Sequence, residues 1–191
     1  YKVAQRNIKA DAKNVKVLLY SLIIGIIAGL LSSAFRICIS KIENLREKLY
    51  GNFDFSLSPI LEGIGLILLI IGAIQIALFL VKKFAPEAGG SGIQEIEGAL
   101  DEVRPTRWKR VLPVKFIASI FSLGSGMLLG REGPTVQIGA NVGKMVKELF
   151  KQEDEQNNPL LSAGAAAGLA GAFNAPLSGI VFFIEEMHGH F

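Results

Sequence analysis

The chain has 191 residues, of which 50% are hydrophobic and 8% aromatic, and its mean hydropathy is positive. This composition is typical of a helical membrane protein and argues against a water-soluble domain. The formal net charge is only +3, and the placement of the basic residues around apolar spans accounts for it, so we expect no nucleic-acid partner.

The first long apolar run is VKVLLYSLIIGIIAGLLSSAFRICI, residues 15–39. As a helix it is long enough to cross a hydrocarbon core of about 30 Å. A signal peptide is the alternative, but the run is longer than the apolar region of such a peptide and no clear cleavage site follows. We therefore expect a membrane domain over residues 15–191, preceded by a cytoplasmic segment over residues 1–14. The single cysteine, Cys38, lies in this run and is expected to be a packed thiol.

Two further apolar runs follow, at residues 60–81 and 111–129, and the second of these is shorter and rich in Ser and Gly. Basic residues flank the spans unevenly. They gather before the first span (Lys2, Arg6, Lys9, Lys13 and Lys16) and after the second (Lys82, Lys83, Arg104, Arg107, Lys109 and Arg110). By the positive-inside rule, the N-terminus is expected in the cytoplasm and the protein in the inner cell membrane, as a multi-pass protein embedded in the lipid bilayer.

The remaining apolar segments are too short to span a bilayer. They cover residues 92–100, 134–150, 160–173 and 177–187. Broken helices in a membrane chain indicate a transporter core, because non-helical backbone is tolerated at depth only where it lines a protein-enclosed or wet site. Small residues also recur in G-x-x-x-G pairs, for which close helix packing is expected. These pairs are Gly25/Gly29, Gly126/Gly130, Gly139/Gly143 and Gly164/Gly168.

A glycine-rich break, GGSGIQE at residues 89–95, precedes the first short segment. Its three glycines allow a tight turn with exposed amides, the following helix directs its positive end back toward the turn, and Ser91 adds a hydroxyl donor. Neutral donors of this kind suit a transported anion, which must bind and then leave. The alternative is an ordinary serine cap after a glycine turn.

A second break, GREGP at residues 130–134, places two charges in an apolar neighbourhood. Pro134 suits the first position of a helix, so Glu132 is expected at the threshold, where its carboxylate occupies the place of a mobile anion. Protonation would release it, and an ionisable residue inside a membrane indicates function. The alternative, in which Glu132 only caps the helix and pairs with Arg131, places two costly charges at membrane depth.

Three signatures occur in order along the chain: GSGIQEIEGAL, GREGPTVQIGANVG and GAAAGLAGAFNAPLSGIVFFIEEM. Together they resemble the chloride channel and chloride–proton antiporter (CLC) family, most of all its bacterial antiporters, from about residue 15 to residue 187. The resemblance implies an all-α membrane protein of broken and tilted transmembrane helices, with this chain as the first of two inverted repeats. It also implies a homodimer in which each subunit has its own ion pathway.

The resemblance further implies residue roles. Ser91 matches the serine that coordinates the anion, and Glu132 matches the gating glutamate, which occupies anion sites when ionised and carries a proton when neutral. Glu186 matches the acid that takes up protons on the cytoplasmic side of antiporters, with Glu97 as its neighbour, and channel-type members generally lack that acid. The proton pathway is therefore expected to use Glu132, Glu186 and Glu97. The expected anion-binding residues are Ser91, Gly92, Ile93, Arg131, Glu132 and Gly133.

The chain departs from the family pattern in two ways. Gln94 stands where the family usually has proline, which restores an N–H in the first helical turn. A second repeat, with its own anion-facing helix and a pore tyrosine, cannot be located within these residues. We expect chloride/proton antiport, with chloride and protons as the transported partners. The alternatives are a passive chloride channel and an isolated half-transporter that does not transport.

Other motifs are weaker. GANVGKM, residues 139–145, is one residue short of a phosphate-binding loop and ends in methionine, so helix packing is expected there. In EEMHGH, the side chains of Glu185, His188 and His190 could hold a metal, but close histidines at a chain end are more often solvated, and no metal is expected. No nucleophile–base arrangement stands out. We therefore expect a secondary active transporter rather than an enzyme, with no cofactor and with chloride as both ligand and substrate.

Overall fold

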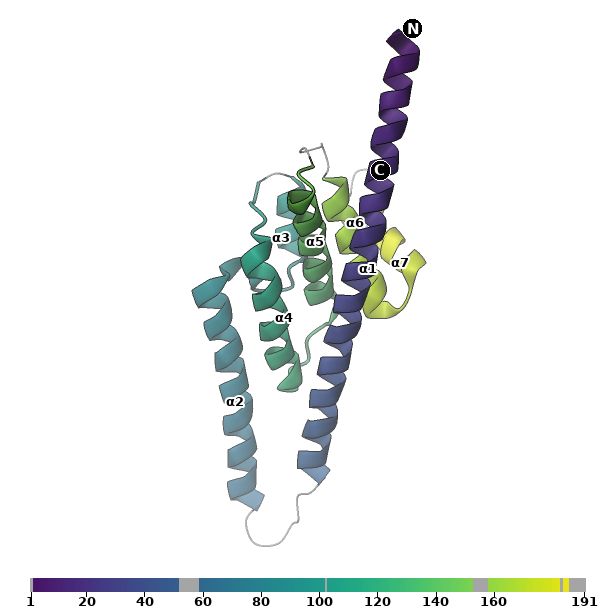
Figure 1. The fold of residues 1–191 in the computed structure, drawn as a ribbon. Coiled ribbons are helices and arrows are strands. Elements are labelled where there is room, and N and C mark those ends of the chain that lie inside the picture. The colour runs from purple at the N-terminus through teal and green to yellow at the C-terminus, as the bar shows by residue number, and fades with distance from the viewer. Residues whose placement is uncertain (1, 52–58, 102, 153–157, 183, 186–191) are drawn as a thin grey trace.

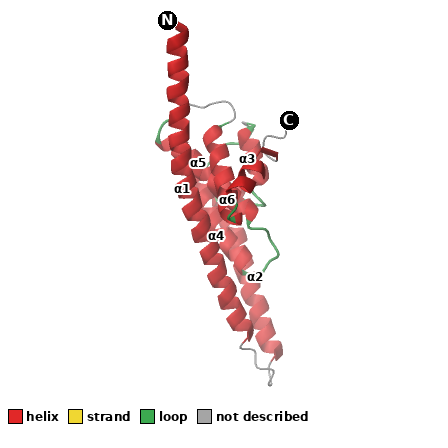
Figure 2. Ribbon diagram, turned by 90° about the vertical axis from the view of Figure 1, so that its right-hand side faces the viewer, coloured by secondary structure: helices red, strands yellow, loops and turns green. Residues whose placement is uncertain are grey.

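The computed structural model describes residues 2–51, 59–101, 103–152, 158–182 and 184–185. This part of the chain contains helices and no strands, as the composition predicts (Figures 1 and 2). The helices are α1 (Lys2–Gly51), α2 (Pro59–Phe84), the 3₁₀ turn η1 (Pro86–Ala88), α3 (Ile93–Leu100), α4 (Trp108–Gly124), α5 (Glu132–Leu149), α6 (Pro159–Phe173) and α7 (Pro176–Phe182).

Among the helices of the described residues, α1 and α2 are long and apolar enough to cross a membrane. The qualifying segments are Val15–Lys48 and Gly63–Phe84, so the first two predicted spans are confirmed as helices. α1 is longer than the sequence predicts, because its helix continues past Ile39 to Gly51 and its N-terminal end projects beyond the other helices (Figure 1). α2 packs mainly on α4 and η1, and most of its large apolar side chains are exposed, as on a lipid-facing helix.

The third predicted run, residues 111–129, is only partly helical. α4 ends at Gly124, and the break that follows begins earlier than the sequence indicates. Gly126 has a φ of +94°, a left-handed conformation that glycine adopts without strain and that ends the helix. Gly126 and Gly130 therefore belong to a non-helical segment, and the predicted helix packing of this pair is wrong.

The centre of the fold is α5, which packs against α1, α3, α4 and α6 and is buried along most of its length (Figure 1). α5 and α6 cross so closely that their backbones are in contact. A side chain at Gly139 would collide with the carbonyl oxygen of Gly164, and one at Gly168 with that of Thr135. The predicted packing of Gly139/Gly143 and Gly164/Gly168 is thus confirmed, because only glycine permits this approach.

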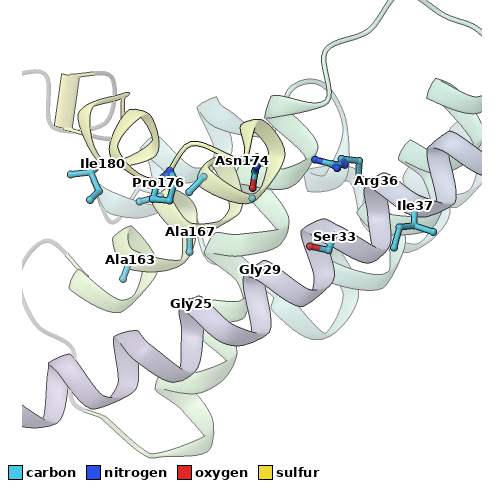
Figure 3. A pocket seen from close by; sticks show the side chains of 13 residues that line it. Gly25, Gly29, Ser33, Arg36, Ile37, Ala163, Ala167, Asn174, Pro176 and Ile180 are labelled. Carbon is cyan, nitrogen blue, oxygen red and sulfur yellow. The ribbon is translucent and has the colours of Figure 1, made fainter.

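The pair Gly25/Gly29 behaves differently. No atom lies within 4 Å of where a side chain would begin at either position, so the predicted close packing is absent there. Both glycines instead line a cavity of about 750 Å³ between α1, α6 and α7 (Figure 3). The other labelled residues around it include Ser33, Arg36 and Asn174.

Candidate functional site

The two glycine-rich breaks meet at one cavity of about 560 Å³. Its lining comes from α2 and α4, from the turn before α3, from the segment between α4 and α5, and from the start of α5. Four of the six predicted anion-binding residues line it: Ser91, Ile93, Glu132 and Gly133.

The turn before α3 carries Ser91 between two glycines in the left-handed region, Gly90 at φ +65° and Gly92 at φ +91°. α3 begins after Gly92, and its first turn receives no hydrogen bond from a capping side chain. The alternative that Ser91 is an ordinary helix cap is therefore wrong. Its side chain is exposed to the cavity, and the first amides of α3 lack partners within their own helix.

The start of α5 lies directly against this turn. A side chain added at Gly133 would collide with the Ser91 backbone carbonyl and lie 2.6 Å from Ser91 Oγ. The N-terminal ends of α3 and α5 are thus brought together, with the Ser91 hydroxyl between them. Because each helix N-terminus carries partial positive charge, this junction favours an anion.

Glu132 is the first residue of α5 and is half-buried at the cavity. The helix begins two residues earlier than predicted, so Pro134 is its third residue rather than its first. This position is still in the first turn, where proline's missing N–H has no partner to lose. The Glu132 carboxylate folds back toward Gly130, where any side chain would meet Glu132 Oε2.

Arg131 does not line the cavity. Its guanidinium pairs with Glu43 of α1, with 2.9 Å between Nη2 and Oε1, so the predicted alternative in which Glu132 pairs with Arg131 is wrong. An arginine of α1, Arg46, donates to the carbonyl of Gly124 at 3.5 Å. Both contacts attach the segment between α4 and α5, which leads to Glu132, to α1.

Sequence analysis missed a buried cation, Lys115 of α4, which is only 2% exposed. Its ammonium donates to three carbonyl oxygens, those of Ala88 at 3.0 Å, Gly90 at 2.8 Å and Ser91 at 3.4 Å. Lys115 therefore fixes the turn that carries Ser91 and adds positive charge beside the cavity. The only sequence signal was a lysine in the middle of the apolar run at 111–129.

The predicted proton-pathway residues are less completely described. Glu97 is half-buried on α3, one helical turn beyond the residues that line the cavity. Glu186 lies outside the described residues, as do His188 and His190 of the weak metal motif. Glu185 is described and exposed. Within the described residues, no group of three His, Cys, Asp or Glu side chains could hold a metal ion.

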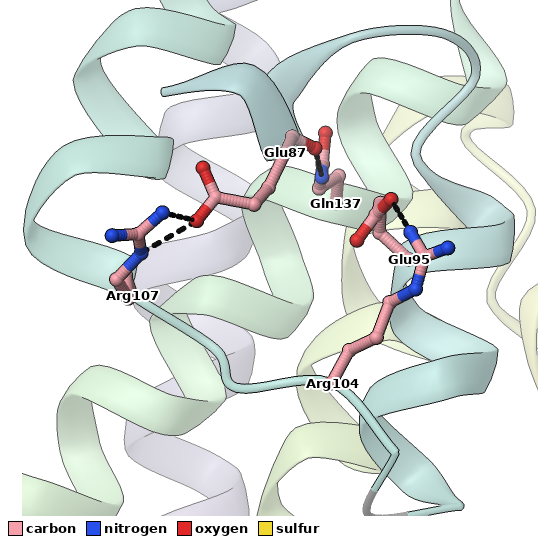
Figure 4. A network of polar contacts seen from close by, with 5 residues as sticks. All are labelled: Glu87, Glu95, Arg104, Arg107 and Gln137. Atoms are coloured by element: carbon pink, nitrogen blue, oxygen red, sulfur yellow. Dashed lines mark hydrogen bonds and ion pairs between the residues drawn. The ribbon is translucent and has the colours of Figure 1, made fainter. Parts of the chain in front are cut away.

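A polar network lies beside the Ser91 turn (Figure 4). Arg107 pairs with Glu87 of η1, Arg104 pairs with Glu95 of α3, and Gln137 Nε2 of α5 donates to the Glu87 carbonyl at 2.7 Å. Partial burial raises the pKa of the Glu87 carboxyl, but hydrogen bonds from its own backbone and from Arg107, with the charges of Arg107 and Arg110, lower that pKa below its ordinary value overall. Glu87 therefore holds Arg107 and the adjoining 103–107 segment to η1 as a carboxylate.

Comparison with known proteins gives consistent matches. A family model described as "Voltage gated chloride channel" matches residues 71–191. The chain is 49% identical to the H⁺/Cl⁻ exchange transporter ClcA of Citrobacter koseri over 98% of its own length and 39% of that protein. It is 48% identical to ClcA of Salmonella arizonae over 100% of its length and 40% of that protein. The chain therefore spans about two fifths of these relatives.

Two solved structures share the fold. A slow cyanobacterial Cl⁻/H⁺ antiporter superimposes with a TM-score of 0.83 and 40% identity, covering 90% of this chain and 40% of that one. A CLC-type fluoride/proton antiporter gives a TM-score of 0.73 over the same shares, at 24% identity. The predicted fold class is thereby confirmed.

Proposed function

The chain belongs to the voltage-gated chloride channel family, and on that premise we propose that it supplies the first half of a chloride/proton antiporter. The named relatives are exchange transporters, which favours antiport over a passive channel. The chain covers about two fifths of their length, so the proposal assigns it one repeat of a larger, dimeric membrane protein. The N-terminus of that protein faces the cytoplasm, and the protein lies in the inner membrane.

One observation carries the proposal: the contact between Ser91 and Gly133, which joins two helix N-termini at one open cavity. Chloride there is held by the Ser91 hydroxyl and by amides of Gly92, Ile93 and Gly133, with the Lys115 charge behind the turn. These are mostly neutral donors, so the anion is bound without being trapped.

Glu132 acts as the gate in this mechanism. Ionised, its carboxylate competes with chloride for the same N-terminal amides, because both are anions. When it takes up a proton it becomes neutral, leaves those amides and admits chloride. Glu186 and Glu97 deliver that proton from the cytoplasmic side, by a route separate from the anion's. Exchange is coupled because one acid cannot hold the proton and occupy the anion site at once.

Reconstitution into liposomes tests this function. The chain is assayed alone and joined to the part of the Citrobacter koseri relative that it does not cover, under a chloride gradient and with proton movement recorded. We expect the gradient to drive protons uphill. Glu132→Ala and Glu186→Ala should each abolish proton movement, with chloride still passing in Glu186→Ala, while the neighbouring control Glu185→Gln remains coupled.

Other outcomes favour the alternatives. Chloride flux without proton movement in the unmodified protein would support a passive channel. Flux in the joined protein but not in the chain alone would show that this half does not transport by itself, which its coverage of the relatives favours. Absence of both fluxes in both forms would overturn the antiport proposal.

A further inference from the structure

A third, much smaller cavity lies between α3, α5, η1 and the 105–107 segment. Its polar lining comes from Glu87, Glu95, Thr106, Arg107, Gln137 and Asn141. The room inside is about 10 Å³, which is close to what a single water molecule requires.

Three buried oxygens around this cavity have no hydrogen-bond partner in the described part of the chain: Glu87 Oε2, Gln137 Oε1 and Asn141 Oδ1. Gln137 and Asn141 are each only 1% exposed, so bulk water does not reach them. A buried acceptor left without a donor costs about 1–3 kcal/mol, and native proteins rarely leave several around one cavity. None of the described residues that line the cavity, Thr106 and Arg107 included, donates to these three oxygens.

The orientation of both amides is fixed by their other hydrogen bonds. Gln137 Nε2 donates to the Glu87 carbonyl, and Asn141 Nδ2 donates to the Gln137 carbonyl, each at 2.7 Å. Rotating either amide would bring two oxygens together, so neither can turn its own N–H groups into the cavity. Gln137 and Asn141 are one helical turn apart on α5, which places both amides on the same face.

From these contacts we infer that the cavity between α5 and η1 binds one water molecule, which donates hydrogen bonds to the unpartnered oxygens of Gln137 and Asn141 beside Glu87. A neutral donor fits better than a metal cation, because Arg107 already places its positive charge against Glu87 at this cavity. The volume also leaves no room for the water shell of an ion.

The bound water has a consequence for the Ser91 turn, and this part rests on the proposed function. The Gln137 side chain lies against Gly92, where an added side chain would be 2.6 Å from Gln137 Oε1, and its amide nitrogen holds the carbonyl of Glu87. Gln137 therefore contacts both ends of the 87–92 segment, which carries Ser91, and Figure 4 shows the contact with Glu87. The water fixes the Gln137 side chain by bonding to its Oε1. Gln137 is therefore a positioning residue for the Ser91 turn and the anion site.

Crystals of the protein, grown in sodium and in rubidium salts and diffracting well enough to show ordered water, test the site directly. We expect one peak about 2.7–3.0 Å from Gln137 Oε1 and Asn141 Oδ1. It should show no anomalous signal with rubidium. An empty cavity would overturn the proposal, and so would a rubidium signal, which would mean a monovalent cation.

The positioning role is tested with Asn141→Leu, which is similar in size and removes the Oδ1 acceptor together with the Nδ2 donor to the Gln137 carbonyl. We expect the water to be lost, the apparent KM for chloride to rise several-fold and the maximal rate to change little. Gln152→Leu is the matched control, because its amide bonds to Tyr20 and Phe150 away from the Ser91 turn, and its KM should be unchanged. An unchanged KM in Asn141→Leu would overturn the positioning role. If the unmodified protein transports neither ion, the proposed function fails. The electron density from the crystals still shows whether the water is bound.

Discussion

Arg131 and Glu43, 88 residues apart in sequence, form an ion pair of 2.9 Å that ties the start of α5 to α1. Both side chains are partly exposed, at 44% and 31%, so solvent weakens the attraction. The pair fixes the position of the segment before Glu132 more than it stabilises the fold.

We predict a small energetic coupling for this pair. In a double-mutant cycle of Glu43→Gln and Arg131→Gln, thermal unfolding in detergent should give a coupling of about 0.2–1 kcal/mol. Glu47→Gln, on the exposed face of the same helix, is the control. A coupling of several kcal/mol would mean that the pair is far less accessible to solvent than its exposure indicates.

The contact between Ser91 and Gly133 predicts that Gly133→Ala weakens chloride binding. The added methyl group would press on the Ser91 carbonyl and hydroxyl and displace the turn. The apparent KM for chloride should rise several-fold in the flux assay. Gly63→Ala, where a side chain meets open space, should leave KM unchanged. Equal KM values for the two variants would mean that Ser91 is not part of the chloride site.

Lys115 offers a test of the charge behind the turn. Lys115→Met keeps the length of the side chain but removes three hydrogen bonds and a positive charge. Because the Ser91 turn loses these bonds and the nearby positive charge, chloride affinity should fall on the order of tenfold, which corresponds to about 1.4 kcal/mol. Lys144→Met removes a more exposed lysine of α5, 4.0 Å from Glu148, and should bind chloride normally. Calorimetric titration with chloride distinguishes the two.

The crossing of α5 and α6 predicts opposite effects for two Gly→Ala changes. Gly164→Ala places a methyl group against the backbone of Gly139 and should destabilise the protein by about 1–3 kcal/mol. Gly25→Ala projects into a cavity and should stabilise α1 by up to about 1 kcal/mol through helix propensity. Thermal unfolding measures both, and a destabilising Gly25→Ala would show that this face is occupied by another part of the protein.

The lowered pKa of Glu87 predicts a loss of stability in acid. A carboxyl with a lowered pKa in the folded state contributes stability above its ordinary value of 4.5, and that contribution is lost as the pH falls through the folded pKa. Unfolding temperatures measured from pH 6 down to pH 3 should therefore drop more steeply for the unmodified protein than for Glu87→Gln. The control Glu47→Gln should follow the unmodified protein, and parallel curves for all three would contradict the prediction.

Local features of the sequence predicted much of this fold. Continuous apolar runs predicted α1 and α2, and the glycine-rich breaks predicted the starts of α3 and α5 to within two residues. They succeeded because span length and glycine conformation depend on neighbours in the chain. The C-terminal end of α1 was predicted too early, at Ile39. The residues after Ile39 are more polar and give no apolar signal, although the helix continues to Gly51.

Contacts between distant residues were the main omission. Nothing in the local pattern joins Lys115 to the carbonyl of Ser91, or Arg131 to Glu43 rather than to its neighbour Glu132. Identical glycine spacings also gave different outcomes, since Gly139 meets another backbone and Gly25 faces a cavity. A spacing shows that a close approach is allowed. Whether a partner is there depends on the tertiary structure.

The length of α1 has a mechanical consequence. Fifty helical residues measure about 75 Å, more than twice the hydrocarbon thickness of a bilayer, and no proline interrupts them. α1 packs against α5 and α6. Near its C-terminal end, Glu43 and Arg46 contact the segment between α4 and α5. One helix therefore connects the projecting N-terminal end to the segment between α4 and α5. We therefore expect a tag, an antibody or a protein bound at its projecting end to disturb the residues that precede Glu132, because Glu43 and Arg46 connect them to the same helix.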